Sequence, residues 1–149
     1  MSNQENSELG KLININEDAC EFYESAQEKV EDPQLKATFG NLENLHKGVI
    51  HNLQNRVRAN GGDPDAQETL AGQVQQFWGE LMAKISNDVD ETFVTYLEEA
   101  EDRCLHSIQD AIKSDEISVA TKSALQSEAS ALRKSHDYMK ALKDTMKAA

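Results

Sequence analysis

Residues 30–39, VEDPQLKATF, contain the break that decides how this chain folds. Proline cannot continue a helix that reaches it from the N-terminal side, because its ring clashes with the preceding turn, but it suits the first turn of a new helix. The sequence therefore predicts one helix that ends near Glu31 and a second that begins at Pro33. A connection this short makes the two helices antiparallel neighbours.

Apolar residues recur at spacings of three and four on the N-terminal side of the break, which is typical of the buried face of a helix. Ser7 is a favourable N-cap. We therefore predict that the first helix covers residues 7–31 and that residues 1–6 are disordered. The predicted buried stripe consists of Leu9, Leu12, Ala19, Tyr23, Ala26 and Val30.

The second helix is predicted to end at Asn60-Gly61-Gly62, because glycine is favoured just after the last helical turn. Residues 65–85 also have a helical pattern, which two glycines interrupt. We predict that they form a crossover helix on the outside of the core, with an apolar patch around Phe77 and Trp78. The stripe of the second helix consists of Leu35, Phe39, Leu42, His46, Val49, Leu53 and Val57.

Two further helices are predicted in the C-terminal half. Ser86-Asn87-Asp88 is expected to cap the third helix, and Ser114-Asp115 to end it and cap the fourth. We therefore predict a single all-α domain over residues 1–149, a four-helix bundle with a long helical crossover between core helices 2 and 3. The two stripes are Val89, Phe93, Leu97, Ala100, Cys104, Ile108 and Ala111, then Leu125, Glu128, Leu132, Ser135 or His136, Met139, Leu142 and Met146.

The composition argues against several classes of function. The formal charge of −12 repels phosphate backbones and anionic lipids, so we expect neither a nucleic-acid partner nor a membrane partner. The N-terminal residues lack the pattern of a signal peptide, which favours a cytoplasmic location. Cys20 and Cys104 have the spacing of neither a zinc site nor a redox pair, so we expect two buried thiols.

Polar residues on the apolar stripes are the candidates for a functional site, since the core of a bundle is otherwise apolar. Asn16 interrupts the first stripe and His46 the second, while Glu101 borders the third and Glu128 lies on the fourth. Counted from the predicted turns, all four lie near the middle of the bundle. We therefore expect polar side chains from several helices to meet there.

Two interpretations of these residues stay open. They form hydrogen bonds across the core, or they bind iron or manganese, because di-iron and di-manganese proteins hold their metals in the middle of a bundle. Glu43-x-x-His46 places a carboxylate and an imidazole on one helix face, but the fourth helix has Ala131, not histidine, three residues after Glu128. The predicted metal ligands are Glu43, His46, Glu101 and Glu128, with Glu17 or Glu21 from the first helix.

Several segments between about Leu9 and Leu142 resemble a bacterial family of ferritin-like four-helix-bundle domains of unknown function. The resemblance implies a ferritin-like architecture with a long crossover, and the wider superfamily binds iron or manganese for storage, peroxide removal or oxidation. Cys104 stands where a second inward glutamate would accompany Glu101. The segments are the 30–39 turn, Gly61-Gly62-Asp63-Pro64, Trp78-x-x-Leu81, Leu97-Glu98-Glu99-Ala100-Glu101 and His136-Asp137.

Three hypotheses about function follow. The first is a non-enzymatic ferritin-like bundle with a stress-associated or interaction-mediating role, acting as a homodimer. The second is an iron- or manganese-binding protein or di-metal oxidase that uses the mid-bundle carboxylates and histidine. The third is a partner-binding module that uses the apolar patch around Phe77 and Trp78.

Overall fold

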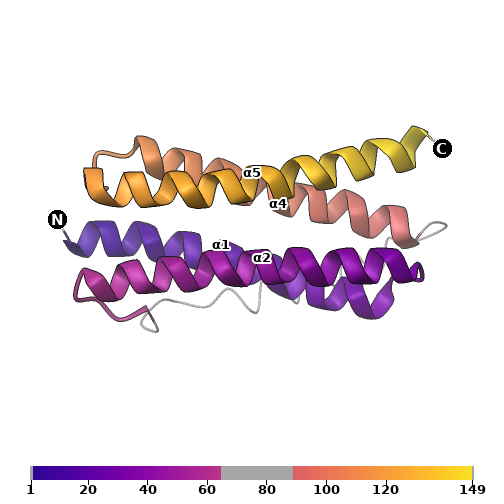
Figure 1. The fold of residues 1–149 in the computed structure, drawn as a ribbon, viewed down its shortest axis with the longest axis horizontal. Coiled ribbons are helices and arrows are strands. Elements are labelled where there is room, and N and C mark those ends of the chain that lie inside the picture. Colours follow the sequence, from indigo (N-terminus) through magenta and orange to yellow (C-terminus); the bar gives the residue numbers. More distant parts are fainter. Residues whose placement is uncertain (1, 65–88, 149) are drawn as a thin grey trace.

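The computed structural model describes residues 2–64 and 89–148, and all of the regular elements in these two ranges are helices (Figure 1). They are α1 (Ser2–Lys29), α2 (Pro33–Ala59), α4 (Val89–Lys113) and α5 (Val119–Ala148). This confirms the prediction of an all-α four-helix bundle. The predicted crossover helix, its patch at Phe77 and Trp78, and the predicted cap at residues 86–88 lie outside the described residues.

The direction of each helix follows from contacts between the helices. Pro33 is the first residue of α2, and the Asp32 side chain caps that helix by accepting a hydrogen bond from the backbone N–H of Gln34 at 2.8 Å. The resulting tight connection makes α1 and α2 antiparallel, as predicted. Asp90 accepts hydrogen bonds from the backbone of residues 31 and 32, so α4 begins where α1 ends. Consequently α2 and α4 run in the same direction, and α5 runs parallel to α1 (Figure 1).

The predicted start of the first helix at Ser7 is wrong, because α1 begins at Ser2 and residues 2–6, expected to be disordered, are helical. The reason is a tertiary contact that the local pattern does not reveal. The buried Glu5 carboxylate accepts hydrogen bonds from the backbone N–H of Ser118 at 2.7 Å and from the Thr121 hydroxyl at 3.0 Å. The Asn60 amide donates to the same carboxylate, so this side chain fastens α1 to α2 and α5.

The cap of the last helix also differs from the prediction. Ser114 follows the end of α4 as expected, and its hydroxyl accepts a hydrogen bond from the backbone of Glu116. The residue that caps α5 is Ser118, whose hydroxyl accepts from the backbone N–H of Thr121 at 3.2 Å. The four residues after Ser114 therefore form a turn, and α5 begins at Val119.

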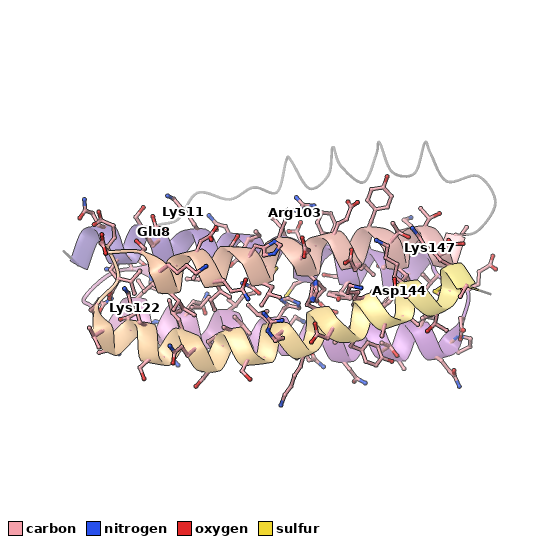
Figure 2. All side chains as sticks on the ribbon, turned by 90° about the horizontal axis from the view of Figure 1, so that it is seen from above. Glu8, Lys11, Arg103, Lys122, Asp144 and Lys147 are labelled. Atoms are coloured by element: carbon pink, nitrogen blue, oxygen red, sulfur yellow. The ribbon has the colours of Figure 1, made fainter. Side chains whose placement is uncertain are left out.

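The core consists of two hydrophobic clusters with a polar layer between them, and side chains fill the space between the helices (Figure 2). One cluster is rich in leucine and isoleucine, and the other contains Tyr23, Phe39 and Phe93. Nearly every apolar residue predicted on the four stripes is buried; Val89, Leu142 and Met146 are partly buried and pack at the edge of the aromatic cluster. No helix among the residues in the two described ranges is long and apolar enough to cross a membrane.

Charge is distributed unevenly among the helices. The neighbouring helices α1 and α4 each contain seven acidic residues and two basic ones. By contrast, α2 contains one acidic residue and four basic ones, and α5 contains three acidic residues and six basic ones. On the acidic side, burial raises the pKa of Asp18 to about 6, and repulsion from Glu21 and Glu17 adds to this effect although Arg103 opposes it. The negative charge of the four described helices is therefore concentrated on the side of α1 and α4.

Replacing Glu5 by alanine is expected to lower the free energy of unfolding by about 2–3 kcal/mol at neutral pH, because three donors lose a charged acceptor. Burial alone would raise the pKa of Glu5, but its hydrogen bonds to Ser118, Asn60 and Thr121 hold the pKa below its ordinary value. The stabilisation is therefore present above the pKa of an unfolded glutamate, about 4.3, and is lost as the pH falls through the folded-state pKa. Urea denaturation of both proteins across this pH range measures the effect.

A matched control is Glu8→Ala, since the Glu8 carboxylate pairs with the exposed Lys11. An exposed pair of this kind contributes about 0–1 kcal/mol. A Glu5→Ala protein as stable as the Glu8→Ala protein would contradict the assignment of Glu5 as a tertiary contact.

Candidate functional site

Five polar side chains form one buried layer in the middle of the bundle, and every helix of the bundle contributes at least one of them. Each side chain is at most 1% exposed. The structure thus brings together two of the four predicted metal ligands, His46 and Glu101. The members, called the polar layer below, are Asn16 and Tyr23 on α1, His46 on α2, Glu101 on α4 and Ser135 on α5.

His46 lies at the centre of this layer with both ring nitrogens occupied. The Asn16 amide nitrogen donates to the backbone carbonyl of Leu12 at 2.8 Å, which leaves the amide oxygen facing the ring. That oxygen accepts from Nδ1 of His46 at 2.7 Å. On the other side, Nε2 lies 2.6 Å from Oε1 of Glu101, which is a short hydrogen-bond distance. The histidine therefore connects α1 to α4 through the core.

The Glu101 carboxylate receives hydrogen bonds from three helices on a single oxygen. Besides His46, the hydroxyls of Tyr23 and Ser135 donate to Oε1 at 2.6 Å and 2.7 Å. The second oxygen, Oε2, is buried and has no hydrogen-bond partner among the described residues. A buried acceptor without a partner is unfavourable by about 1–3 kcal/mol, so the three contacts at Oε1 have to compensate for it.

The environment of Tyr23 keeps its hydroxyl group protonated. Burial raises the pKa of Tyr23 well above its ordinary value, and the charge of the neighbouring Glu101 carboxylate raises it further. A protonated phenol can donate but does not act as an anionic ligand or base at neutral pH. The centroid of the Tyr23 ring lies 5.8 Å from the centroids of the Phe39 and His46 rings, and these contacts position the ring against the layer.

The other predicted ligands lie elsewhere. Glu43 is buried, but its carboxylate accepts from the Gln27 amide at 2.8 Å and pairs with Lys47 at 3.2 Å. Glu128 is half-buried and accepts from the Asn52 amide at 2.7 Å; burial raises the pKa of Glu128. The side chain of Glu21 is exposed on α1, and that of Glu17 is half-buried. The helical spacing of Glu43 and His46 therefore places them on one helix face without joining them in one site.

Within residues 2–64 and 89–148, no group of three or more histidine, cysteine, aspartate and glutamate side chains is arranged to hold a metal ion. The ligation of iron or manganese by Glu43, His46, Glu101 and Glu128 stays a prediction. Of that set, the structure brings only His46 and Glu101 within bonding distance of each other.

Two members of the layer were not among the four candidates from the sequence. Tyr23 was assigned to the apolar core, which is correct for its ring but overlooks its hydroxyl. Ser135 was an alternative to His136 on the fourth stripe, and the structure selects Ser135: it is 1% exposed, whereas His136 approaches Asp102 at 3.2 Å. The signal that could have identified both is a hydroxyl group on a predicted buried stripe, since a buried hydroxyl needs a hydrogen-bond partner.

The two cysteines are buried thiols, as predicted, and neither is in a disulfide. Their sulfurs lie 3.7 Å from the backbone carbonyls of Glu43 and Ile15. Burial, followed by the charge of Glu43, raises the pKa of Cys20 to about 12. Burial, followed by the charge of Glu101, raises the pKa of Cys104 well above its ordinary value. Both thiols are therefore protonated and unreactive at neutral pH, because the thiolate is the nucleophile.

Removing the carboxylate at the centre of the layer tests its structural role. Glu101→Leu is expected to lower the free energy of unfolding by about 3–5 kcal/mol, because it leaves a buried histidine without its partner. The double variant His46→Leu/Glu101→Leu is expected to lose clearly less than the sum of the two single changes. Urea denaturation of the four proteins gives this coupling, and Glu99→Leu at an exposed position on α4 is the control. Additive losses would show that the two side chains are not coupled.

The thiols provide a test of packing in the native protein. A colorimetric disulfide reagent at neutral pH is expected to label neither Cys20 nor Cys104 in the folded protein and both in denaturant, because labelling requires an exposed thiolate. Rapid labelling of either residue under native conditions would contradict the burial described here.

Comparison with known proteins gives one match. The sequence profile of a family described as "Domain of unknown function (DUF2383)" matches residues 4–114, which include α1, α2 and α4. No curated protein and no solved structure matches the chain. The match contains four of the five residues of the polar layer and ends before α5, which provides Ser135. Because the matched range exceeds half of the chain, the protein belongs to the DUF2383 family of domains of unknown function.

Proposed function

We propose that this protein is a non-enzymatic, ferritin-like helical bundle that acts by associating with protein partners. The observation that carries the proposal is the closure of the polar layer. Its five side chains are at most 1% exposed, and every nitrogen and hydroxyl described for them already has a partner within the protein. A substrate would have to displace these contacts and separate the helices before reaching the histidine.

The ferritin-like part of the proposal rests on helix direction. Helices α2 and α4 run in the same direction, and each is antiparallel to α1 (Figure 1). Four-helix bundles of the ferritin type have this arrangement, with one long connection between the second and third core helices. The resemblance of the sequence to ferritin-like domains agrees with it.

The residues do not fit the dinuclear centre that ferritin-like proteins use. Such a centre takes a glutamate from each of two helices and Glu-x-x-His from each of the other two. Here α1 presents Asn16 and Tyr23 to the layer, and α5 presents Ser135. Glu43 and Glu128, which would complete the set, are engaged with Gln27 and Asn52. His46 and Glu101 alone supply too few ligands for two metal ions.

The surface between α2 and α5 has features that favour binding to another protein. Two hollows of about 220 and 160 Å³ lie along the boundary between α2 and α5, and both have mainly apolar linings. Tyr138, one of the two large hydrophobic residues most exposed in the described ranges, borders the smaller hollow. Exposed aromatic side chains beside hollows are characteristic of surfaces that bind other proteins.

Metal analysis separates this proposal from the metal-binding hypothesis. Protein purified without chelator is expected to contain no near-stoichiometric iron or manganese, because the donors are too few and are already hydrogen-bonded. Added Fe²⁺ or Mn²⁺ is expected to leave the melting temperature unchanged, since a ligand that binds only the folded state raises it. Elemental analysis and thermal denaturation measure the two quantities.

The decisive comparison uses Glu101→Gln, with Glu99→Gln on the same helix as the control. Near-stoichiometric metal in the wild type and in Glu99→Gln, but not in folded Glu101→Gln, would overturn the non-enzymatic proposal in favour of a metal site in the polar layer.

A further inference from the structure

The boundary between α2 and α5 has a clear register. The Arg56 side chain donates to the Thr121 hydroxyl at 2.8 Å, and the Asn52 amide donates to Glu128 at 2.7 Å. The two helices are therefore antiparallel, and one turn further along each of them Gly48 lies opposite Ala131. We call the outward surface along this boundary the α2–α5 face.

The centre of the α2–α5 face is formed by small residues. Gly48 is exposed, and a Cβ atom built there meets no atom of residues 2–64 and 89–148 within 4 Å. Ala131 is half-buried. Small side chains allow another helix to approach closely, so the face has no protruding group at its middle.

A hollow and an aromatic side chain lie at equal distances on either side of this centre. Ala124, seven residues before Ala131, lines the hollow of about 220 Å³ together with Leu53, Leu125 and Glu128. Tyr138, seven residues after Ala131, is 51% exposed. Seven residues are two turns of helix, or about 10.5 Å along the axis, so hollow and ring are placed symmetrically about Ala131.

One pair of opposite charges on α5 shows the same symmetry. Glu128 precedes Ala131 by three residues and Lys134 follows it by three. A separation of six residues along one helix is outside the range of side-chain pairing within that helix. Among the residues that line the two hollows, only Arg56 and Glu128 are charged, whereas α1 and α4 each contain seven acidic residues.

We propose that the α2–α5 face binds the same face of a second copy of this chain and forms a two-fold symmetric dimer. The axis lies in the interface, perpendicular to the helices, at the level of Gly48 and Ala131. This operation packs α5 antiparallel against the partner's α5, so each Tyr138 ring enters the hollow at the other copy's Ala124. It also brings each Glu128 to the same height as the other copy's Lys134.

The identity of the partner follows from the self-complementarity of this surface. In a two-fold interface the same patch occurs on both subunits, so a ring on one half of the face requires a hollow on the other half. The acidic helices α1 and α4 lie on the side of the bundle away from the contact, which limits the electrostatic repulsion between two acidic copies. This inference rests on the proposed role in association and adds that the partner is a second copy.

The size of the face is adequate for a stable dimer. The 27 residues of α2 extend over about 40 Å, and two packed helices are about 20 Å wide. The product, about 800 Å², equals the area that a standard protein–protein interface buries on each partner. Depletion of charged residues at the centre of the contact is also the usual composition of such interfaces.

Analytical ultracentrifugation of the full chain at tens of micromolar tests the proposal. The wild type is expected to sediment as a dimer of the 16.6 kDa chain. Gly48→Glu is expected to be monomeric, because it places two carboxylates together at the two-fold axis, and the open space at this position lets the monomer fold. His106→Glu, an exposed position on α4, is the matched control and is expected to remain dimeric.

The charge pair tests the predicted pairing of α5 with α5. Glu128→Lys and Lys134→Glu are each expected to weaken dimerisation by about tenfold or more, and the double variant to restore it, since the exchanged charges meet again across the axis. Tyr138→Ala is expected to weaken the dimer as well, and Tyr138→Phe to preserve it.

Two outcomes would overturn the dimer: a monomeric wild type, or a dimer that persists unchanged in Gly48→Glu. Absence of rescue in the double charge variant, with each folded, would also reject this register. None of these outcomes bears on the metal analysis, which tests the non-enzymatic role separately.

Discussion

The structure depends on one interaction, the contact between the Glu101 carboxylate and the donors that three other helices direct at it. Taking a carboxylate and an imidazole out of water is unfavourable by several kcal/mol, and only well-placed partners offset this. Oε1 of Glu101 has three partners, from α1, α2 and α5. Because Oε2 has none among the described residues, any shift of a helix that removed one donor would leave the buried charge poorly compensated. The polar layer therefore fixes the heights of all four helices relative to one another.

This fixed register has consequences at both ends and at the surface. The aliphatic cluster and the aromatic cluster lie on opposite sides of the layer, so neither can slide into the other without moving a polar group into an apolar environment. Near the N-terminus of α1, the buried Glu5 carboxylate also joins helices, because it accepts hydrogen bonds from the end of α2 and from the start of α5. At the surface, the register decides that Gly48 faces Ala131 and that the larger hollow forms between Asn52 and Ala124.

Much of the fold follows from local sequence, because helical periodicity and the break at Pro33 act within a few residues. The buried stripes, the antiparallel first pair and the mid-bundle position of Asn16, His46 and Glu101 are all predictable in this way. The start of α1 is not, since it depends on Glu5 meeting residues more than fifty positions away. Glu128 fails as a member of the layer because of its height: Ser135 lies seven residues further along α5, two turns away on nearly the same helix face, and Glu128 lies instead beside Asn52. Sequence spacing therefore predicts the buried face of a helix more reliably than the height of a side chain, because the height depends on where the preceding turn ends, and α5 begins only at Val119.

The ferritin-like resemblance does not by itself determine whether the middle of the bundle binds metal. A metal centre in a bundle requires inward-facing carboxylates at one height on every helix, whereas a hydrogen-bonded layer requires only donors and acceptors that match. Asparagine, tyrosine and serine satisfy the second requirement and not the first. In this protein Tyr23 and Ser135 donate to the Glu101 carboxylate, and Asn16 accepts from the His46 ring. A helical bundle can in this way use a polar layer to fix the register of its helices without the set of inward-facing carboxylates that a metal centre requires.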